Sequence, residues 1–254
     1  MKITYAPFHR WYKPAVAEPT DLYGKKNRKR ILSTIQRLEE NAIETIIAPL
    51  DEAFLSWFVP MYEETIATRQ NAKVHDVRAA TIEKEESLST YYSLTTLQNN
   101  EILGGVIFGV REDRLMTAYK VFKPKWVTGT LQANPTLLSE YILSKHAFSL
   151  GKKLVSHGKD RNPYGVNAAI GLATFKLSTG YKPMIKADYE DYFPQEIIIE
   201  GLKEDCLVLH YPTTGEVITK ATLIAKSDAL EKYTQLLSYT GVLSIDVKSI
   251  ESLV

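Results

Sequence analysis

The stretch LVSHGKDRNPYGVNAAIGLATFKLSTGYKP, residues 154–183, decides the fold of this chain. Its first residues are apolar and predict a short buried strand, and a polar turn follows at Asp160–Tyr164. A helix at about Val166–Ser178 comes next, and a second strand at Tyr181–Ile185 begins just after Gly180. A strand, a helix and a strand in this order predict a parallel crossover with a right-handed connection. Side chains that can react or bind ligands gather around the turn: His157, Lys159, Asp160, Arg161, Asn162 and Tyr164.

An antiparallel meander is predicted upstream of this crossover. Short turns, one of them Asn99–Asn100, separate three apolar runs, and such turns join antiparallel neighbours. The second run is almost continuously apolar, which is typical of a central strand covered on both faces. In the third run, alternation places Leu115, Thr117, Tyr119 and Val121 on one face. The three predicted strands are Tyr91–Gln98, Ile102–Arg111 and Leu115–Phe122.

Helices flank these strands, and the ends of the chain add further elements. Asp51 is predicted to cap a helix that Pro60 kinks or splits, and Asn134–Pro135 starts a helix that ends before Gly151. The aromatics and prolines of residues 1–23 predict an extended arm over the core. The remaining predicted elements are a helix at Arg28–Ala42, strands at Glu196–Glu200, Cys206–Tyr211, Gly215–Ala225 and Val242–Val247, and a helix at Asp228–Leu237. We expect residues 1–44 to form an N-terminal arm and helix, 45–190 the core, and 191–254 a C-terminal α/β extension of the same domain.

Composition excludes several classes of protein. The 254 residues are 44% hydrophobic and 24% charged, as in ordinary globular proteins. Cys206 is the single cysteine, which excludes an intramolecular disulfide and a cysteine-based metal site. No apolar run approaches the roughly 18 residues of a membrane span, and residues 1–14 lack the apolar core and cleavage site of a secretory signal, so we expect a cytoplasmic protein. The net charge of +1 argues against a protein that coats nucleic acid. Because the histidines lack ligand spacing, we expect no metal.

This order of elements resembles the GNAT acyltransferase fold, in particular its FemAB-like branch of aminoacyl and peptidoglycan-type transferases. The resemblance lies in the helix before the meander, in the hairpin LTTLQNNEILGGVIFGV at 94–110, and in the helix after Pro135. It also includes GLATFKLSTGYKP at 171–183, where Phe175–Lys176 precede Gly180. It covers about residues 45–190. It implies a mixed α/β fold with a twisted mixed sheet, and transfer of an acyl or aminoacyl group from an activated donor to an amine.

The donor is left open by a departure from the family pattern. In acetyl-CoA enzymes of this fold a loop rich in Gln, Arg and Gly binds the phosphates, whereas Val127–Thr136 has one glycine and no arginine. Backbone amides and lysines remain to bind an anion, and we expect them at Lys123, Lys125, Gly129, Asn134, Thr136 and Leu137. The donor is then a co-substrate, aminoacyl-tRNA or acyl-CoA, with no tightly bound cofactor. The alternatives are an acetyl-CoA-dependent N-acetyltransferase with a degenerate loop and a non-catalytic binding or assembly protein.

Acyl transfer to an amine needs a base and a cation or acid for the leaving group. His157 is the candidate base because its reference pKa is near neutrality, although a lone histidine is also a common structural residue. Asp160 orients His157 or the amine, or else it makes an Asx turn. Tyr164 is a candidate acid or pocket wall. The resemblance implies that Lys176 reaches the leaving group, and the alternative is a solvated helix lysine.

Other side chains are candidates for substrate binding. Lys159 and Arg161 suit a phosphate or carboxylate, or else they are surface residues. Trp57, Tyr62 and Arg69 flank the Pro60 break, with core packing as the alternative for the two aromatics and surface exposure for Arg69. The basic cluster of Lys25, Lys26, Arg28, Lys29 and Arg30 leads into a helix and suits the phosphates of tRNA or a nucleotide, or else it is a solvated helix start.

Overall fold

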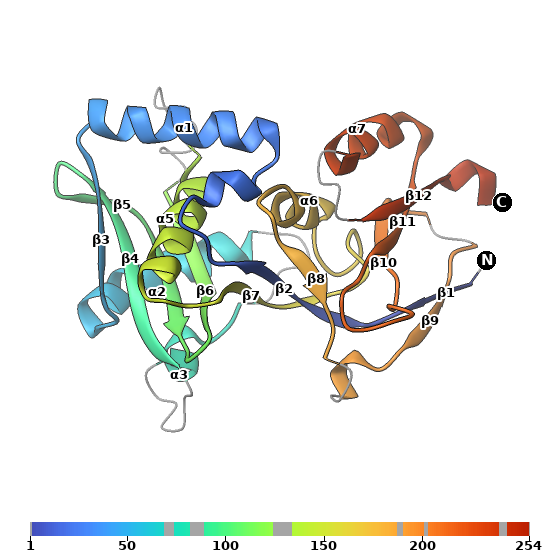
Figure 1. The fold of residues 1–254 in the computed structure, drawn as a ribbon, viewed down its shortest axis with the longest axis horizontal. Helices are drawn as coiled ribbons and strands as arrows, with labels where there is room; N and C mark the ends of the chain where they lie inside the picture. Colours follow the sequence, from blue (N-terminus) through green and yellow to red (C-terminus); the bar gives the residue numbers. More distant parts are fainter. Residues whose placement is uncertain are drawn as a thin grey trace. The chain divides into compact units, whose positions relative to one another are not determined.

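The structure is a computed structural model that describes residues 2–68, 74–81, 89–123, 134–186, 190–200, 203–238 and 243–253 (Figure 1). The chain divides into two compact units. We call Pro14–His157 the central unit, and Met1–Lys13 together with Gly158–Val254 the terminal unit. The expected boundaries at residues 44 and 190 stay a prediction.

The central unit contains the predicted meander and a parallel pair, β6 and β7, that α5 connects; the helix and second strand of the crossover predicted at residues 154–183 belong to the terminal unit. Its strands are ordered β3-β4-β5-β6-β7; the neighbours from β3 to β6 are antiparallel, and β6 and β7 are parallel. The mixed sheet confirms the predicted α/β fold class. β3 was not predicted because its side chains are mostly exposed, which removes the apolar alternation of a strand. The elements are η1 (Pro19–Leu22), α1 (Lys25–Glu40), β3 (Ile43–Pro49), α2 (Glu52–Ala67), α3 (Val77–Thr81), β4 (Thr90–Gln98), β5 (Glu101–Val110), β6 (Arg114–Phe122), α5 (Pro135–Ser149) and β7 (Leu154–Arg161).

Helix α2 begins as predicted and continues where a break was expected. The Asp51 carboxylate accepts a hydrogen bond from the Phe54 amide at 2.8 Å and caps the helix. Pro60 lies inside one uninterrupted helix, so of the two predicted outcomes, a kink or a split, the split does not occur. The apolar face of the helix packs on the sheet and buries Phe54, Leu55, Phe58 and Tyr62 together with Ile107 and Val121. This packing holds the helix together across the proline.

Strand β6 contains a bulge that changes which side chains share a face. Tyr119 lies opposite Ile107 of β5, but Thr117 lies opposite Phe108, so Ala118 is an extra residue. Because Ile107 and Phe108 point to opposite faces, their partners Tyr119 and Thr117 do so as well. Tyr119 contacts the Tyr62 ring of α2. The expectation that Thr117 shares a face with Tyr119 and Val121 is therefore wrong.

The terminal unit is built from strands of both chain ends. β1 pairs with β9 and β2 with β8, both antiparallel, and β10, β11 and β12 form a separate sheet. The N-terminal segment is extended as expected, and within it β2 is a strand whose alternate side chains are buried. Its elements are β1 (Lys2–Tyr5), β2 (Phe8–Pro14, whose last residue falls in the central unit), α6 (Ile170–Ser178), β8 (Lys182–Met184), η2 (Glu190–Tyr192), β9 (Gln195–Ile198), β10 (Cys206–Leu209), β11 (Lys220–Ala225), α7 (Ser227–Ser238), β12 (Ser244–Ser249) and η3 (Ile250–Leu253).

The segment after β7 is held tightly against β10. Asn162 donates from Nδ2 to the carbonyls of Ala6 and Leu209 at 3.0 and 2.7 Å, and its Oδ1 accepts from the Leu209 amide at 3.1 Å. Tyr164 and Leu207 exchange two backbone hydrogen bonds of 2.9 Å. The turn predicted at Asp160–Tyr164 starts later than expected, because β7 continues through Arg161. Asp160 is therefore a strand residue whose direction is set by the pleat.

Gly165 is expected to be essential for this docking. Its φ is +95°, and a Cβ at this position would lie 2.0 Å from the Asp205 carbonyl oxygen. Gly215→Ala is a matched control, since Gly215 has a φ of +66° and nothing within 4 Å of an added Cβ. We expect the control to lose about 1–2 kcal/mol of unfolding free energy from the left-handed backbone alone. Gly165→Ala should lose clearly more in urea unfolding, and equal losses would show that the chain accommodates the contact.

Candidate active site

The Asp160 carboxylate is the centre of a buried polar cluster in the terminal unit. Its Oδ2 accepts three hydrogen bonds, from Lys176 Nζ at 2.6 Å, Tyr164 Oη at 2.7 Å and Trp11 Nε1 at 2.9 Å. The Asp160 side chain is 14% exposed and that of Lys176 is 5% exposed. Within the described part of the chain, no hydrogen bond is made to Oδ1 of Asp160. One carboxylate oxygen is therefore saturated by protein donors and the other is left for a ligand.

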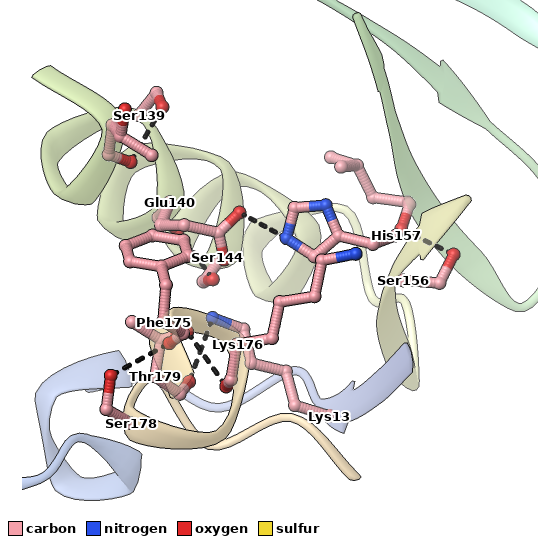
Figure 2. A network of polar contacts seen from close by, with 12 residues as sticks. Lys13, Ser139, Glu140, Ser144, Ser156, His157, Phe175, Lys176, Ser178 and Thr179 are labelled. Carbon is pink, nitrogen blue, oxygen red and sulfur yellow. Dashed lines mark hydrogen bonds and ion pairs between the residues drawn. The ribbon is translucent and has the colours of Figure 1, made fainter. Parts of the chain in front are cut away.

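Three separate elements supply these groups. Asp160 lies on β7 and Trp11 on β2, while Lys176 lies in the last turn of α6. A cation is favourable at the C-terminus of a helix, where carbonyl groups give the helix dipole its negative end. Lys13 is also buried; it donates to the Thr179 carbonyl at 3.4 Å and lies over the Tyr181 ring at 4.4 Å. Figure 2 shows the hydrogen bonds around Thr179 at this helix end.

The charge state of the cluster follows from its environment. Burial raises the pKa of Asp160, but the positive charge of Lys176, the proximity of His9 and hydrogen bonds from Lys176 and Tyr164 outweigh it, and the net pKa is below the ordinary value. Burial, followed by the Asp160 charge, raises the pKa of Tyr164 well above 10. Burial lowers the pKa of His9 to about 3. At neutral pH the cluster thus holds a carboxylate, a protonated tyrosine and a neutral histidine.

The positions of the hydrogens can be assigned from this charge state. Tyr164 has one hydroxyl hydrogen, and both Asp160 Oδ2 and His9 Nε2, at 2.8 Å, are within reach. The ionised carboxylate is the stronger acceptor, and without a hydrogen between them the two oxygens would repel. The hydroxyl therefore donates to Asp160 and accepts from His9 Nε2. The other ring nitrogen of His9, Nδ1, is buried and has no hydrogen-bond partner in the described part of the chain.

A second buried acid–base pair lies in the central unit. His157 Nε2, at the end of this unit's part of β7, is 3.2 Å from Glu140 Oε1 on α5. The two side chains are 7% and 2% exposed. Figure 2 shows the imidazole pointing toward the Glu140 carboxylate. His157 thus has an acidic partner that the sequence interpretation did not name. The available signal was a glutamate inside the apolar helical run LLSEYIL at 137–143.

The predicted catalytic residues are therefore partly brought together. Asp160, Tyr164 and Lys176 share one cluster, and His157 pairs with Glu140 in its own unit. His9 and Trp11 of β2 were missed, and their signal was the alternation of FHRWYKP at 8–14, in which every second side chain is buried. The catalytic role of each residue stays a prediction.

The predicted substrate-binding residues lie in different surroundings. Lys159 pairs with Asp191 at 2.6 Å and lies over the Phe8 ring at 4.5 Å, whereas Arg161 is exposed with its guanidinium 6.0 Å from that ring. Tyr62 is buried in the apolar cluster between α2 and the sheet, and Trp57 packs against this cluster. Both aromatics therefore match the core-packing alternative. Arg69 lies outside the described residues.

Three of the predicted donor-binding residues, Asn134, Thr136 and Leu137, lie at the start of α5, which Asn134 caps. The Asn134 side chain accepts from the Leu137 amide at 3.0 Å, so this amide must change partners before it can bind a phosphate. Thr136 lies beside it in the first turn of α5. Lys123 pairs with Glu101 at 2.7 Å. Lys125 and Gly129 lie outside the described residues.

Comparison with known proteins identifies the fold. No protein-family model and no curated protein sequence matches the chain. Among solved structures, FemX is 10% identical, with a TM-score of 0.50 over 70% of this chain and 59% of FemX. L-PGS from Bacillus licheniformis is 12% identical, with a TM-score of 0.45 over 96% of this chain and 67% of that one. A tandem GNAT protein from the clavulanic acid biosynthesis pathway is 10% identical, with a TM-score of 0.40 over 70% and 50% of the two chains.

The likeness to FemX shows that the two chains share a fold, in agreement with the GNAT-like fold that the resemblance implied. The chain spans less than two thirds of the length of FemX. None of the helices in the described ranges is long and apolar enough to cross a bilayer. The cytoplasmic location stays a prediction.

Proposed function

We propose that the protein transfers an acyl or aminoacyl group from an activated donor to a primary amine. The observation that carries the proposal is the buried Lys176–Asp160 pair, in which a cation is held 2.6 Å from a carboxylate that keeps one oxygen unbonded in the described part of the chain. A buried ion pair adds little to stability compared with apolar side chains of similar size. Its presence on a GNAT-like fold therefore supports a role in chemistry.

The reaction requires that one proton and one leaving group be accounted for. The amine nitrogen forms a bond to the acyl carbon, and the bond from that carbon to the leaving oxygen or sulfur breaks. Lys176 places positive charge where negative charge develops on the acyl oxygen and the leaving group. Lys176 gives a proton to the leaving group, and the proton lost by the amine returns to Lys176 through Asp160. The enzyme ends in its starting charge state.

The proposal is tested by transfer assays with radiolabelled acetyl-CoA and aminoacyl-tRNAs against a panel of primary amines. Lys176→Gln is expected to lower the rate by about 100-fold or more, the usual cost of removing a group that stabilises transition-state charge. Lys182→Gln, which removes an exposed lysine of the same unit, should leave the rate unchanged. The absence of transfer from every donor would support the non-catalytic alternative. Transfer that survives Lys176→Gln would show that the site is elsewhere.

The basic cluster of α1 supports a tRNA donor. Lys25, Lys26, Arg28, Lys29 and Arg30 are all exposed, and they lie inside the helix, which begins three residues earlier than predicted. No acidic residue occupies the first turn, and among the described residues the cluster makes one ion pair, Arg28 with Asp21 at 3.4 Å. Five cations at the N-terminus of a helix repel one another and favour a polyanion.

Neutralising three of these lysines is expected to weaken RNA binding. Replacing Lys25, Lys26 and Lys29 by glutamine removes up to three phosphate contacts, which reduces the slope of log affinity against log salt by about 2 for a single strand. The matched control replaces the exposed Lys220, Lys226 and Lys232 and changes the net charge equally. Fluorescence anisotropy with deacylated tRNA at several salt concentrations measures the slope. Equal slopes in the two triple variants would contradict an α1 binding site.

A further inference from the structure

The hydroxyl of Thr117 is a buried polar group that has no hydrogen-bond partner among the described residues. Thr117 is 5% exposed, and its Oγ1 makes no hydrogen bond within the described part of the chain. An unpaired buried hydroxyl destabilises a fold, because the group loses water and gains nothing in return. A valine has nearly the same shape and carries no such penalty. The position is therefore one where a polar group costs stability.

The bulge in β6 sets the direction of this hydroxyl. The bulge at Ala118 puts Thr117 on the face of Phe108, and the Phe108 ring contacts His146 of α5. The hydroxyl thus points toward α5. The register of β6 with β7 also ends at this position, since Thr117–His157 is its last pair while β6 continues to Phe122. Bulges are common next to active sites, where they redirect a side chain.

His157 and Glu140 lie on the same side of the sheet. As register partners, Thr117 and His157 are neighbours on adjacent strands and point to one face. His157 in turn faces Glu140 of α5 at 3.2 Å. The central unit therefore gathers a hydroxyl, an imidazole and a carboxylate where two parallel strands stop pairing. Ligands of α/β sheets bind at such places.

We propose that Thr117, with the His157–Glu140 pair, forms the binding point for the amine nitrogen of the acyl acceptor. The inference rests on the proposed function and names the group that the function requires beside the base. The attacking amine is neutral, because an ammonium has no lone pair; it has two N–H donors, and Thr117 Oγ1 accepts from one of them. His157 takes the proton that the nitrogen loses as it bonds to the acyl carbon, so that the N–H bond breaks and a ring N–H bond forms. Glu140 stabilises the resulting imidazolium, as a positioning residue.

The inference predicts that removing the Thr117 hydroxyl weakens amine binding without lowering the stability of the fold. Thr117→Val should leave the thermal unfolding midpoint unchanged or raise it by up to about 4 °C, because an unpaired hydroxyl is removed. Thr81→Val is the control in the same unit: Thr81 is 7% exposed, and its hydroxyl donates to the Val77 carbonyl at 2.7 Å. The control should lower the midpoint. A loss for Thr117→Val equal to that of the control would overturn the inference, since the hydroxyl would then be bonded within the protein.

Binding is measured with methylamine as the probe and the ring nitrogens of His157 as the reporter. In nitrogen-15 NMR, methylamine should shift the His157 signals in the natural chain and in Thr117→Ser, which keeps the hydroxyl. Thr117→Val should weaken the apparent affinity by about 10-fold or more. Equal titrations for the valine variant and the natural chain, or no shift in the natural chain, would overturn the inference. A shift that depends on Thr117, without transfer from any donor, would refute the proposed function and leave this amine site standing.

Discussion

Replacing Lys176 by methionine is expected to lower the unfolding free energy by about 3–5 kcal/mol. The substitution keeps the length of the side chain and removes its charge, so that the Asp160 carboxylate stays in a largely buried site without a counter-ion. The hydrogen bonds from Tyr164 and Trp11 remain, but they do not replace the charge. The loss can be measured by urea unfolding at pH 7.

The chain offers a matched control for this substitution. Lys159 and Asp191 make an ion pair of the same length, 2.6 Å, but their side chains are 35% and 54% exposed. Lys159→Met should therefore cost less than about 1 kcal/mol, because water replaces the lost partner. Adding Asp160→Asn to Lys176→Met should recover most of the loss by removing the uncompensated charge. Equal costs for the two lysines, or no recovery in the double variant, would show that the Asp160 site is open to solvent.

Stability is expected to fall steeply in mild acid because of His9. The pKa of His9 is lowered by burial from 6.5 to about 3, so the unfolded chain binds a proton at a pH where the folded chain does not. A depressed folded-state pKa gives stability that is fully present above pH 6.5 and is lost as the pH falls toward 3. The slope from this one group reaches about 1.4 kcal/mol per pH unit. The lowered pKa of Asp160 adds a further loss below its ordinary value of 3.8.

Urea unfolding between pH 4 and pH 8 measures this slope. His9→Gln removes the titrating ring and should flatten the curve between pH 6.5 and pH 4. His75→Gln is the control, since His75 is exposed, and it should leave the slope as in the natural chain. If the His9 variant keeps the full slope, the slope comes from other groups, and burial does not keep His9 neutral in the folded state.

The fold was largely predictable because its decisive elements have clear periodicity. The apolar run of β5, the turn at Asn99–Asn100 and the caps at Asp51 and Asn134 are local signals, and the corresponding elements are present. β2 was missed because its buried side chains include His9 and Lys13, which polarity scales count as exposed. β7 was predicted too short for the same reason, because Lys159 and Asp160 are polar residues of the kind that usually mark a turn. Buried polar residues remove the pattern on which such predictions depend.

The candidate site was predictable only where its residues are close in sequence. Asp160, Tyr164 and Lys176 lie within one strand–turn–helix unit, so a motif places them together. Trp11 is 149 residues before Asp160, and their contact depends on the pairing of distant strands. Glu140 reaches His157 from a helix that the sequence describes well, but its direction toward the sheet depends on packing. Non-local contacts of this kind are not contained in local patterns.

The discontinuous origin of the terminal unit has a consequence for biosynthesis. Trp11 leaves the ribosome 149 residues before Asp160, which at ordinary elongation rates is a delay of about 7–30 s. During that interval the nascent β2 has neither β8 nor the carboxylate that its indole contacts in the finished fold. The cluster around Asp160 therefore assembles late in synthesis. β2, with its aromatic and basic side chains, is therefore accessible to a chaperone throughout that interval.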